Sequence, residues 1–151
     1  MSLVEIKTFQ GEEKIKEQIS SLMNSCLLEE YGDSVKITNV DDLINFYYSR
    51  QDSIIYYLEE DSEFQGFIWL IESSDVLTSQ LFCFFLYLGV VMESRDKGFG
   101  KKLFSYATEA SKARGIKEIK LTVRVDNPKA ISIYKSLGFN ENKYEMIWKD
   151  K

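Results

Sequence analysis

The residues most able to do chemistry form a short basic loop, Arg95-Asp96-Lys97-Gly98-Phe99-Gly100. It follows the apolar run 81–91 and precedes the amphipathic run 101–113, an order that predicts a strand, a tight turn and a helix. Gly98 and Gly100 leave backbone N–H groups unshielded by Cβ atoms, and a helix N-terminus adds unpaired N–H groups with partial positive charge. The loop is therefore predicted to bind an anion, best a phosphate or pyrophosphate. Four basic residues add positive charge to it: Arg95, Lys97, Lys101 and Lys102.

Two common phosphate-binding loops do not fit this sequence. A Walker loop requires Gly-x-x-x-x-Gly-Lys-Ser/Thr, whereas Arg95 stands at the first glycine position and Lys102 at the Ser/Thr position. A dinucleotide fingerprint requires Gly-x-Gly-x-x-Gly early in a βαβ unit, but Leu103 replaces the third glycine and the loop lies late in the chain. A binder of nucleotide phosphates that prefers ATP or NAD is thus a weak alternative.

A third pattern, Arg-x-x-Gly-x-Gly after an apolar strand, resembles the acyl-CoA pyrophosphate loop of the GNAT superfamily of N-acetyltransferases. The flanking residues continue the resemblance in order: Val90 to Ser94, Leu103, Ala107, Ala110, Leu121, Val123, Asn127, Ala130, Tyr134 and Leu137-Gly138-Phe139. The resemblance covers the C-terminal half of the chain closely and the N-terminal half by the order of elements. It implies that acetyl-CoA is the co-substrate.

The resemblance also implies how the protein holds this co-substrate. Backbone amides along the loop would surround the pyrophosphate: Arg95, Asp96, Lys97, Gly98, Phe99 and Gly100, with Lys101 beside them. The preceding strand would splay at Leu88, Gly89 and Val90, whose backbone groups would pair with the pantetheine arm and polarise the acetyl carbonyl. The alternatives are an ordinary strand-to-helix turn and a glycine at 89 that serves packing alone.

Two polar residues complete the site that the resemblance implies. Asn127 would hydrogen-bond the pantetheine arm, and Tyr134 would lie near the thioester sulfur. A phenol with an ordinary pKa of about 10 stays protonated at neutral pH, so Tyr134 can serve as a general acid. Their seven-residue spacing lets one helix face present both. Asn127 could instead only cap the helix, and Tyr134, near Ile131, Ile133 and Leu137, could be a core aromatic.

No general base is evident. The run 81–91 contains no Asp, Glu or His, and Glu72 and Glu93 could act through water or be solvated surface groups. Tyr87 could line the acceptor site or pack. The resemblance places the acceptor site within 27–45. Acidic and tyrosine side chains there would suit a cationic amine, or belong to a solvated helix end: Glu29, Glu30, Tyr31, Asp33, Asp41 and Asp42. A small amine, a polyamine, and a lysine or N-terminus of a protein all stay open as acceptors.

Composition restricts the class of protein. A chain of 151 residues is expected to form a single domain, 1–151, and its net charge of −5 argues against nonspecific nucleic-acid binding. The absence of histidine excludes Ser-His-Asp and Cys-His catalysis and histidine-ligated zinc, so no metal is expected. Cys26 and Cys83 are predicted to be buried, reduced thiols. With no secretory leader and no apolar run of the about 20 residues that cross a bilayer, we expect a cytoplasmic protein without membrane contact.

Hydrophobic periodicity predicts an α+β fold with a mixed sheet. Strands are expected at 3–8, 53–58, 64–71, 81–91 and 119–125, with one or two more within 139–148, and helices near 12–30, 39–47, 98–113 and 128–137. The resemblance adds a GNAT-like acyl-CoA N-acyltransferase fold. It implies a central, mostly antiparallel sheet, a parallel pair splayed at the cofactor site, and about four helices.

These inferences combine into an acetyl-CoA-dependent N-acetyltransferase that acts on a primary amine of a small molecule or protein. Transfer should be direct, because neither cysteine has a basic sequence neighbour or a histidine partner that would make it a nucleophile. The alternative is a noncatalytic acyl-CoA-binding sensor or interaction module of the same fold, since no base is evident. A monomer and a homodimer stay equally open.

Overall fold

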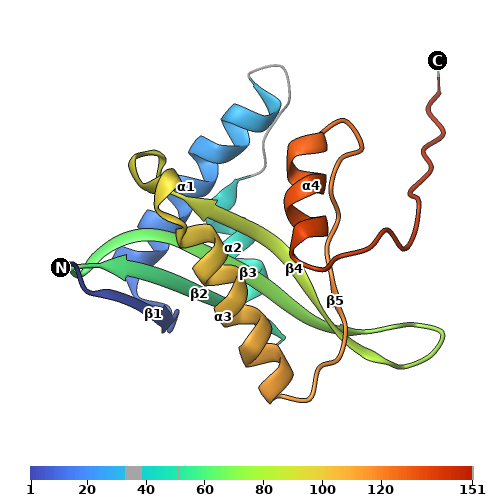
Figure 1. The fold of residues 1–151 in the computed structure, drawn as a ribbon, viewed down its shortest axis with the longest axis horizontal. Coiled ribbons are helices and arrows are strands. Elements are labelled where there is room, and N and C mark those ends of the chain that lie inside the picture. The colour runs from blue at the N-terminus through green and yellow to red at the C-terminus, as the bar shows by residue number, and fades with distance from the viewer. Residues whose placement is uncertain (33–38, 51, 151) are drawn as a thin grey trace. The chain divides into compact units, whose positions relative to one another are not determined.

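The computed structural model describes residues 1–32, 39–50 and 52–150, apart from the side chain of Tyr47. The chain divides into two compact units, Met1–Leu121 and Thr122–Lys151, which are taken in turn. The elements of the first unit are β1 (Val4–Thr8), α1 (Glu13–Tyr31), α2 (Val40–Tyr48), β2 (Ser53–Glu60), β3 (Glu63–Ser74), β4 (Leu81–Val90), the 3-10 helix η1 (Met92–Lys97), α3 (Phe99–Ala113) and β5 (Ile119–Lys120) (Figure 1). The second unit contains α4 (Pro128–Ser136).

The five strands of the first unit form one sheet in the order β1-β2-β3-β4-β5. The first three pairings are antiparallel, and β5 runs parallel to β4 through the pairs Cys83–Ile119 and Phe84–Lys120. The predicted α+β fold with a mixed, mostly antiparallel sheet is therefore confirmed. The four α-helices in the described residues also agree with the prediction, and η1 adds a short fifth helix. None of the described helices is long and apolar enough to cross a membrane.

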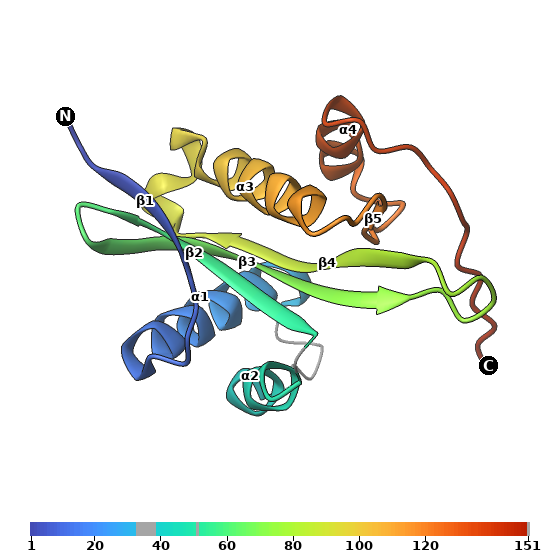
Figure 2. The same ribbon diagram turned by 90° about the horizontal axis from the view of Figure 1, so that it is seen from below.

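Helices cover both faces of the sheet. Figure 2 shows α1 and α2 on one face and α3 on the other. Because side chains alternate along a strand, β2 and β3 contribute to two separate cores. The core under α1 and α2 takes Ile55, Tyr57, Phe67 and Trp69, and the core under α3 takes Tyr56, Leu58, Ile68 and Leu70. These two strands are thus the most buried, rather than the more apolar β4.

An irregularity interrupts the alternation of β4. Trp69 pairs with Tyr87 but Leu70 pairs with Phe85, so Leu86 is an extra residue on β4. Phe85 packs into the α3 core, whereas Leu86 and Tyr87 both pack against the α1 core. The bulge therefore directs the Tyr87 side chain toward α1.

Two segments predicted to form strands differ from the structure. The strand expected at 119–125 is confined to β5, because only Ile119 and Lys120 pair with β4. The strands expected within 139–148 are wrong: this segment has an apolar alternation, but no described residue forms a ladder with it. Tyr144 and Trp148 are accordingly exposed. The single domain over 1–151 stays a prediction.

Helix starts follow the local sequence signals. The Asn39 side chain accepts a hydrogen bond from the Asp42 N–H at 3.1 Å and caps α2. Thr38, a residue type that could also cap a helix beginning here, lies outside the described residues. In the second unit Asn127 caps α4, with Pro128 at the first helical position.

Candidate functional site

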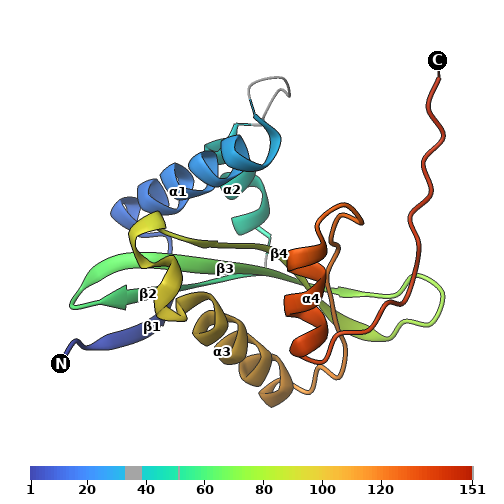
Figure 3. The ribbon, with the colours of Figure 1, turned by 45° about the horizontal axis from the view of Figure 1, so that its top comes forward.

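The predicted loop connects the end of β4 to α3. After Val90 the chain forms η1, passes through Gly98 in the left-handed conformation (φ 78°) and enters α3 at Phe99 (Figure 3). Glycine adopts this conformation without the steric penalty of a Cβ atom. The buried Ser94 hydroxyl donates to Gln65 Oε1 at 2.6 Å and anchors η1 to β3. The turn is thereby held against the sheet.

The start of α3 has backbone donors available. No side chain caps this helix, and the first intrahelical hydrogen bond runs from Lys102 N to Gly98 O at 3.1 Å. The N–H groups of Phe99, Gly100 and Lys101 therefore lack an acceptor within the helix. A Cβ atom at Gly100 would lie 3.7 Å from the Leu88 side chain, so this N-terminus sits against the end of β4. The geometry is that of the predicted anion site, although binding by these residues stays a prediction.

The charges of the loop differ from the sequence expectation. Arg95 Nη1 and Nη2 donate to Glu29 Oε2 and Oε1, both at 3.0 Å, and Arg95 Nε donates to the Val90 carbonyl at 3.3 Å. Lys97 Nζ pairs with Glu60 Oε1 at 2.9 Å. These hydrogen bonds hold the pKa values of the Glu29 and Glu60 carboxyls below their usual range. Arg95 and Lys97 are therefore neutralised structural groups rather than free charges for an anion.

Two other basic residues remain available to bind an anion. Lys101 and Lys102 are exposed in the first turn of α3, and neither makes an ion pair with a carboxylate in the described part of the chain. Their charge adds to the partial positive charge of the helix N-terminus. The electropositive part of the loop is therefore its C-terminal half.

An unpaired strand edge lies beside this loop. Gly66 has no side chain because a Cβ atom there would lie 2.6 Å from the Gly89 carbonyl oxygen, so that carbonyl points toward β3. Backbone groups alternate along a strand, and those of Leu88 and Val90 therefore point to the opposite edge. On that edge β5 pairs with β4 only as far as Phe84 among the described residues. The backbone groups of Leu88 and the Val90 N–H thus face an open edge, while the Val90 carbonyl already accepts a hydrogen bond from Arg95 Nε.

Gly89 has a packing role. A Cβ atom there would lie 3.1 Å from Phe67 Cε1 and 3.4 Å from Leu22 Cδ2. Either neighbour would have to move to admit a side chain. The contact fits the packing alternative for Gly89 and allows α1 to approach β4 closely.

The C-terminal end of α1 meets β4 through a tyrosine. The Tyr87 hydroxyl donates to Glu30 Oε1 at 3.1 Å, and its ring stacks on Phe67 with 6.0 Å between centroids and 16° between planes. Burial, and next the Glu30 charge, raise the pKa of the Tyr87 phenol well above its usual value. The hydroxyl therefore stays protonated and acts as a donor. The packing alternative for Tyr87 is therefore realised, and a place in the acceptor site stays a prediction.

Cys26 has a basic neighbour that its sequence context did not indicate. Arg95 Nη2 lies 3.9 Å from Cys26 Sγ. Burial nevertheless raises the pKa of the Cys26 thiol, and Arg95 acts in the opposite direction with smaller effect. Cys26 and Cys83 are both buried and free, as predicted. The structure thus gives neither thiol the lowered pKa of a nucleophile.

The two carboxylates considered as bases are not on β4. Glu72 pairs across the sheet with Cys83, near the start of β4, and forms an ion pair with Arg114. Glu93 is exposed on η1. Glu72 is therefore at the far end of β4 from Leu88.

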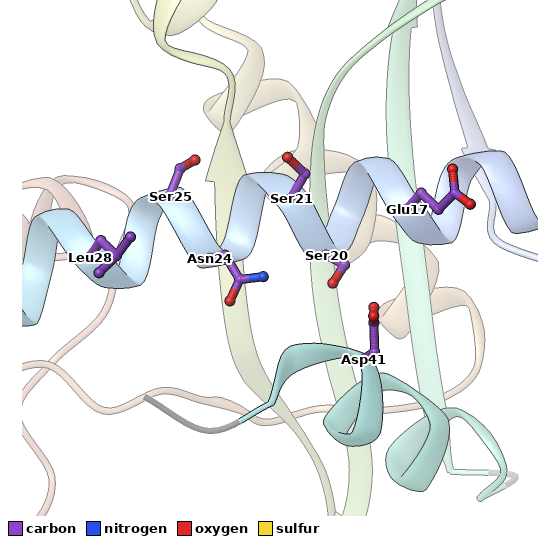
Figure 4. Close-up of a pocket in the computed structure, with 7 residues that line it drawn as sticks. All are labelled: Glu17, Ser20, Ser21, Asn24, Ser25, Leu28 and Asp41. Atoms are coloured by element: carbon purple, nitrogen blue, oxygen red, sulfur yellow. The ribbon is translucent and has the colours of Figure 1, made fainter. Parts of the chain in front are cut away.

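A polar pocket of about 440 Å³ lies between α1 and α2. Figure 4 shows the Asp41 side chain pointing from α2 toward α1. The lining residues are Glu17, Ser20, Ser21, Asn24, Ser25, Leu28 and Asp41. The acceptor region predicted at 27–45 thus shares only Leu28 and Asp41 with it, and Asp33 lies outside the described residues. Polar residues three and four apart along α1 were the signal that could have identified this face.

In the second unit, Asn127 Oδ1 accepts a hydrogen bond from Ala130 N at 3.2 Å. The Tyr134 ring packs edge-on against Phe139 with 5.9 Å between centroids. The capping alternative is therefore realised for Asn127, whereas Tyr134 is only half-buried, on a helix with no buried residue, and belongs to neither core. The roles of both residues toward a ligand stay predictions. Across the described residues, no group of three or more His, Cys, Asp or Glu side chains could hold a metal ion.

Comparison with known proteins gives consistent matches. The sequence model of the acetyltransferase (GNAT) family matches residues 17–139. An uncharacterised N-acetyltransferase of Bacillus subtilis, YhfO, is 27% identical over 114 residues, which are 76% of each chain.

Solved structures share the fold. A possible acetyltransferase from Clostridium difficile 630 superposes with a TM-score of 0.83 at 18% identity, covering 99% of this chain and 98% of that one. An aminoglycoside N-acetyltransferase in complex with CoA has a TM-score of 0.79 at 15% identity, covering 100% of this chain and 97% of that one. At these identities the likeness concerns the fold alone.

Proposed function

Because the chain belongs to the acetyltransferase (GNAT) family, we propose that it transfers an acetyl group from acetyl-CoA to a primary amine of a small molecule or protein. One observation carries the proposal: the uncapped start of α3 lies against the Leu88 and Val90 side chains, at the end of β4 where the outer edge of that strand is open. A phosphate-binding helix end and a hydrogen-bonding strand edge are thus adjacent, as a ligand with a pyrophosphate and an amide-containing arm requires.

Acetyl-CoA fits the residues present. The backbone of Arg95 to Gly100 would hold its pyrophosphate, with Lys101 beside it, and the backbone of Leu88 and Val90 would hold its pantetheine arm. Gly98, in its left-handed conformation with no atom within 4 Å of where a Cβ would be, leaves the approach to these N–H groups clear. When bound, acetyl-CoA supplies a thioester whose acetyl carbon bonds to the amine nitrogen as the C–S bond breaks.

The protein contributes position and proton transfer. Holding the two reactants together makes the reaction effectively intramolecular. A backbone N–H at the β4 edge can stabilise charge on the acetyl oxygen. By the family resemblance, Asn127 would bind the pantetheine arm and Tyr134 would donate a proton to the leaving thiolate. We further propose that 1–151 acts as one N-acetyltransferase domain; a cytoplasmic location and a monomeric or homodimeric state stay predictions from the sequence.

The acceptor is proposed to be cationic. Glu17 and Asp41 contribute carboxylates to the pocket between α1 and α2, among the hydroxyls of Ser20, Ser21 and Ser25. Such a lining suits an amine that carries several charges or hydroxyl groups, because carboxylate and hydroxyl oxygens accept hydrogen bonds from ammonium and hydroxyl groups. The structural neighbour that is an aminoglycoside N-acetyltransferase makes that class a reasonable member of a test panel.

Calorimetric titration with acetyl-CoA, and with ATP as the control ligand, tests the first half of the proposal. Acetyl-CoA should bind and ATP should bind much more weakly. Gly100→Glu should abolish binding by placing a carboxylate at the phosphate site. Ser105→Glu, which adds the same charge at an exposed position of α3, should retain it. No binding to the folded wild type would refute the proposed function.

An amine panel tests the second half. Spermidine, the aminoglycoside sisomicin, lysine and a peptide with a free N-terminus would be assayed for release of free CoA thiol and for the acetylated product by mass spectrometry. Turnover of any panel member supports an enzyme. Tight acetyl-CoA binding without turnover of any amine would instead favour the noncatalytic acyl-CoA sensor.

A further inference from the structure

Two adjacent glutamates at the C-terminal end of α1 have different partners. Glu29 binds the Arg95 guanidinium through both carboxylate oxygens at 3.0 Å. Glu30 accepts a hydrogen bond from the Tyr87 hydroxyl at 3.1 Å and forms no ion pair with a described Lys or Arg. One carboxylate is therefore paired with a cation of the loop, and the other has no described cationic partner.

Tyr87 fixes the position of the Glu30 carboxylate. The bulge at Leu86 directs the Tyr87 ring toward α1, where it stacks on Phe67. Its hydroxyl stays protonated because burial raises the pKa of the phenol, so it can only orient the carboxylate and cannot neutralise it. Tyr87 directly precedes Leu88, whose backbone faces the open edge of β4. The carboxylate is thus tied to the strand that would present the acetyl group.

The charged and titratable groups around Glu30 leave it suited to a cation. Among the described residues they are Tyr87 on β4, Cys26 and Glu29 on α1, and Arg95 on η1. Arg95 is occupied by Glu29, and Cys26 is a buried thiol whose pKa is raised. The exposed Glu30 carboxylate therefore retains capacity to accept hydrogen bonds from an incoming ammonium group.

We propose that Glu30, oriented by Tyr87, receives the ammonium form of the acceptor and takes its proton, directly or through one water. This rests on the proposed N-acetyltransferase function. The ammonium nitrogen loses two protons on becoming an amide: the first goes to the Glu30 carboxylate before the C–N bond forms, and the second leaves as that bond forms. One proton is taken up by the leaving thiolate and one is released to solvent, so each turnover releases one proton. Glu30 would be a catalytic residue and Tyr87 a positioning residue.

Glu30→Gln and Glu29→Gln are a matched pair for the test, because both change one exposed carboxylate to an amide on consecutive residues. With a panel amine that the wild type acetylates, Glu30→Gln should lower kcat/KM for the amine by about 100-fold, the scale of general-base catalysis. The loss should shrink as pH rises toward the pKa of the amine, because the neutral amine then needs no base. Calorimetry should show acetyl-CoA affinity unchanged in Glu30→Gln.

Glu29→Gln should behave differently. Removing the charge frees Arg95 from its bidentate pair, so acetyl-CoA affinity should change while the pH dependence of the acetylation step is retained. If the two variants have the same kinetic and binding profiles, the assignment of Glu30 is overturned. Glu30→Asp keeps the charge but draws it back from Tyr87, and should lie between the wild type and Glu30→Gln.

Tyr87→Phe tests the positioning role, with Tyr57→Phe as its control. Tyr57 also donates to a glutamate, Glu12 Oε2 at 3.3 Å, and belongs to the same core. Tyr87→Phe should shift the acidic limb of the kcat/KM profile for the amine and weaken calorimetric binding of spermidine or sisomicin to the CoA-loaded protein. Tyr57→Phe should do neither, and equal effects of the two variants would reduce Tyr87 to a core residue.

These experiments distinguish failure of the Glu30 role from failure of the proposed N-acetyltransferase function. If the wild type binds acetyl-CoA but acetylates no panel amine, the proposed function fails and the role of Glu30 fails with it. If the wild type is active and Glu30→Gln retains its rate and pH profile, the function stands and the Glu30 assignment alone is wrong.

Discussion

Gly98 offers a quantitative test of the loop, because its conformation and its surroundings have separable effects. Its φ of 78° is left-handed, and a Cβ atom there would meet nothing within 4 Å. Gly115, just beyond the other end of α3, has a φ of 83° and equally open surroundings. Gly98→Ala and Gly115→Ala therefore introduce the same conformational strain, and only the first lies in the proposed pyrophosphate loop.

The cost to stability follows from the backbone alone. A left-handed conformation costs an L-residue about 1–2 kcal/mol, and neither methyl group finds a steric clash to add to it. For a chain of this size 1 kcal/mol corresponds to roughly 2–4 °C in Tm, so each variant should melt about 2–8 °C lower than the wild type. Thermal unfolding followed by circular dichroism would measure this change.

Acetyl-CoA binding should weaken in Gly98→Ala but not in Gly115→Ala. A left-handed alanine at position 98 would place its methyl group in the open space through which a phosphate approaches the N–H groups of Phe99 and Gly100. A hydrogen bond to a charged group contributes about 1.5–3 kcal/mol, so losing one would weaken acetyl-CoA binding by roughly 10- to 150-fold. Calorimetry on both variants measures the difference. Equal acetyl-CoA affinities in two equally destabilised variants would refute the loop's role, and an undiminished Tm in Gly98→Ala would refute its left-handed conformation.

Three further predictions concern other parts of the chain. Tyr134→Phe should lower kcat by about 100-fold, the scale of general-acid catalysis, with a far smaller effect on acetyl-CoA affinity measured by calorimetry; an unchanged kcat would return Tyr134 to a packing role. Asp41→Asn should raise KM for cationic amines in the acetylation assay, whereas Asp42→Asn, its exposed neighbour outside the pocket, should not. Because its hydrogen bond with Lys97 lowers the pKa of Glu60, that pair stabilises the fold above the ordinary glutamate pKa of about 4.3 and ceases to do so as pH falls through the lower, folded-state value. Lys97→Met should therefore melt below the wild type at neutral pH, and the two Tm values should converge in acid; a constant gap at all pH values would contradict the pairing.

The local sequence was sufficient to predict the structure wherever the stabilising hydrogen bonds span only a few residues. The caps at Asn39 and Asn127 bond to N–H groups three residues along the chain, and such contacts depend only on residue type and spacing. Gly98 and Gly115 occur at left-handed positions at the two ends of α3 for the same reason. The order of strands and helices was therefore predictable, whereas the resemblance to the family depended on the glycine loop and its flanking residues.

Strand length was less predictable, because a strand needs a partner. The segment after Lys120 alternates as a strand should, yet pairing with β4 ends there among the described residues. The apolar alternation near Tyr144 likewise has no described ladder. An alternating pattern indicates what a segment can do, whereas hydrogen bonding to a neighbouring strand decides whether it does so.

The chemistry of the site depended on contacts between distant residues. By sequence alone Arg95 was a positive charge for a phosphate, but the fold brings it against Glu29, 66 residues away. Tyr87 and Glu30, 57 residues apart, meet because the bulge in β4 turns the tyrosine toward the end of α1. The sequence by itself determined the elements, the glycine loop and the inventory of charges. Only the tertiary structure decided which charges neutralise each other and which remain available, because that depends on which faces of the helices and strands pack together.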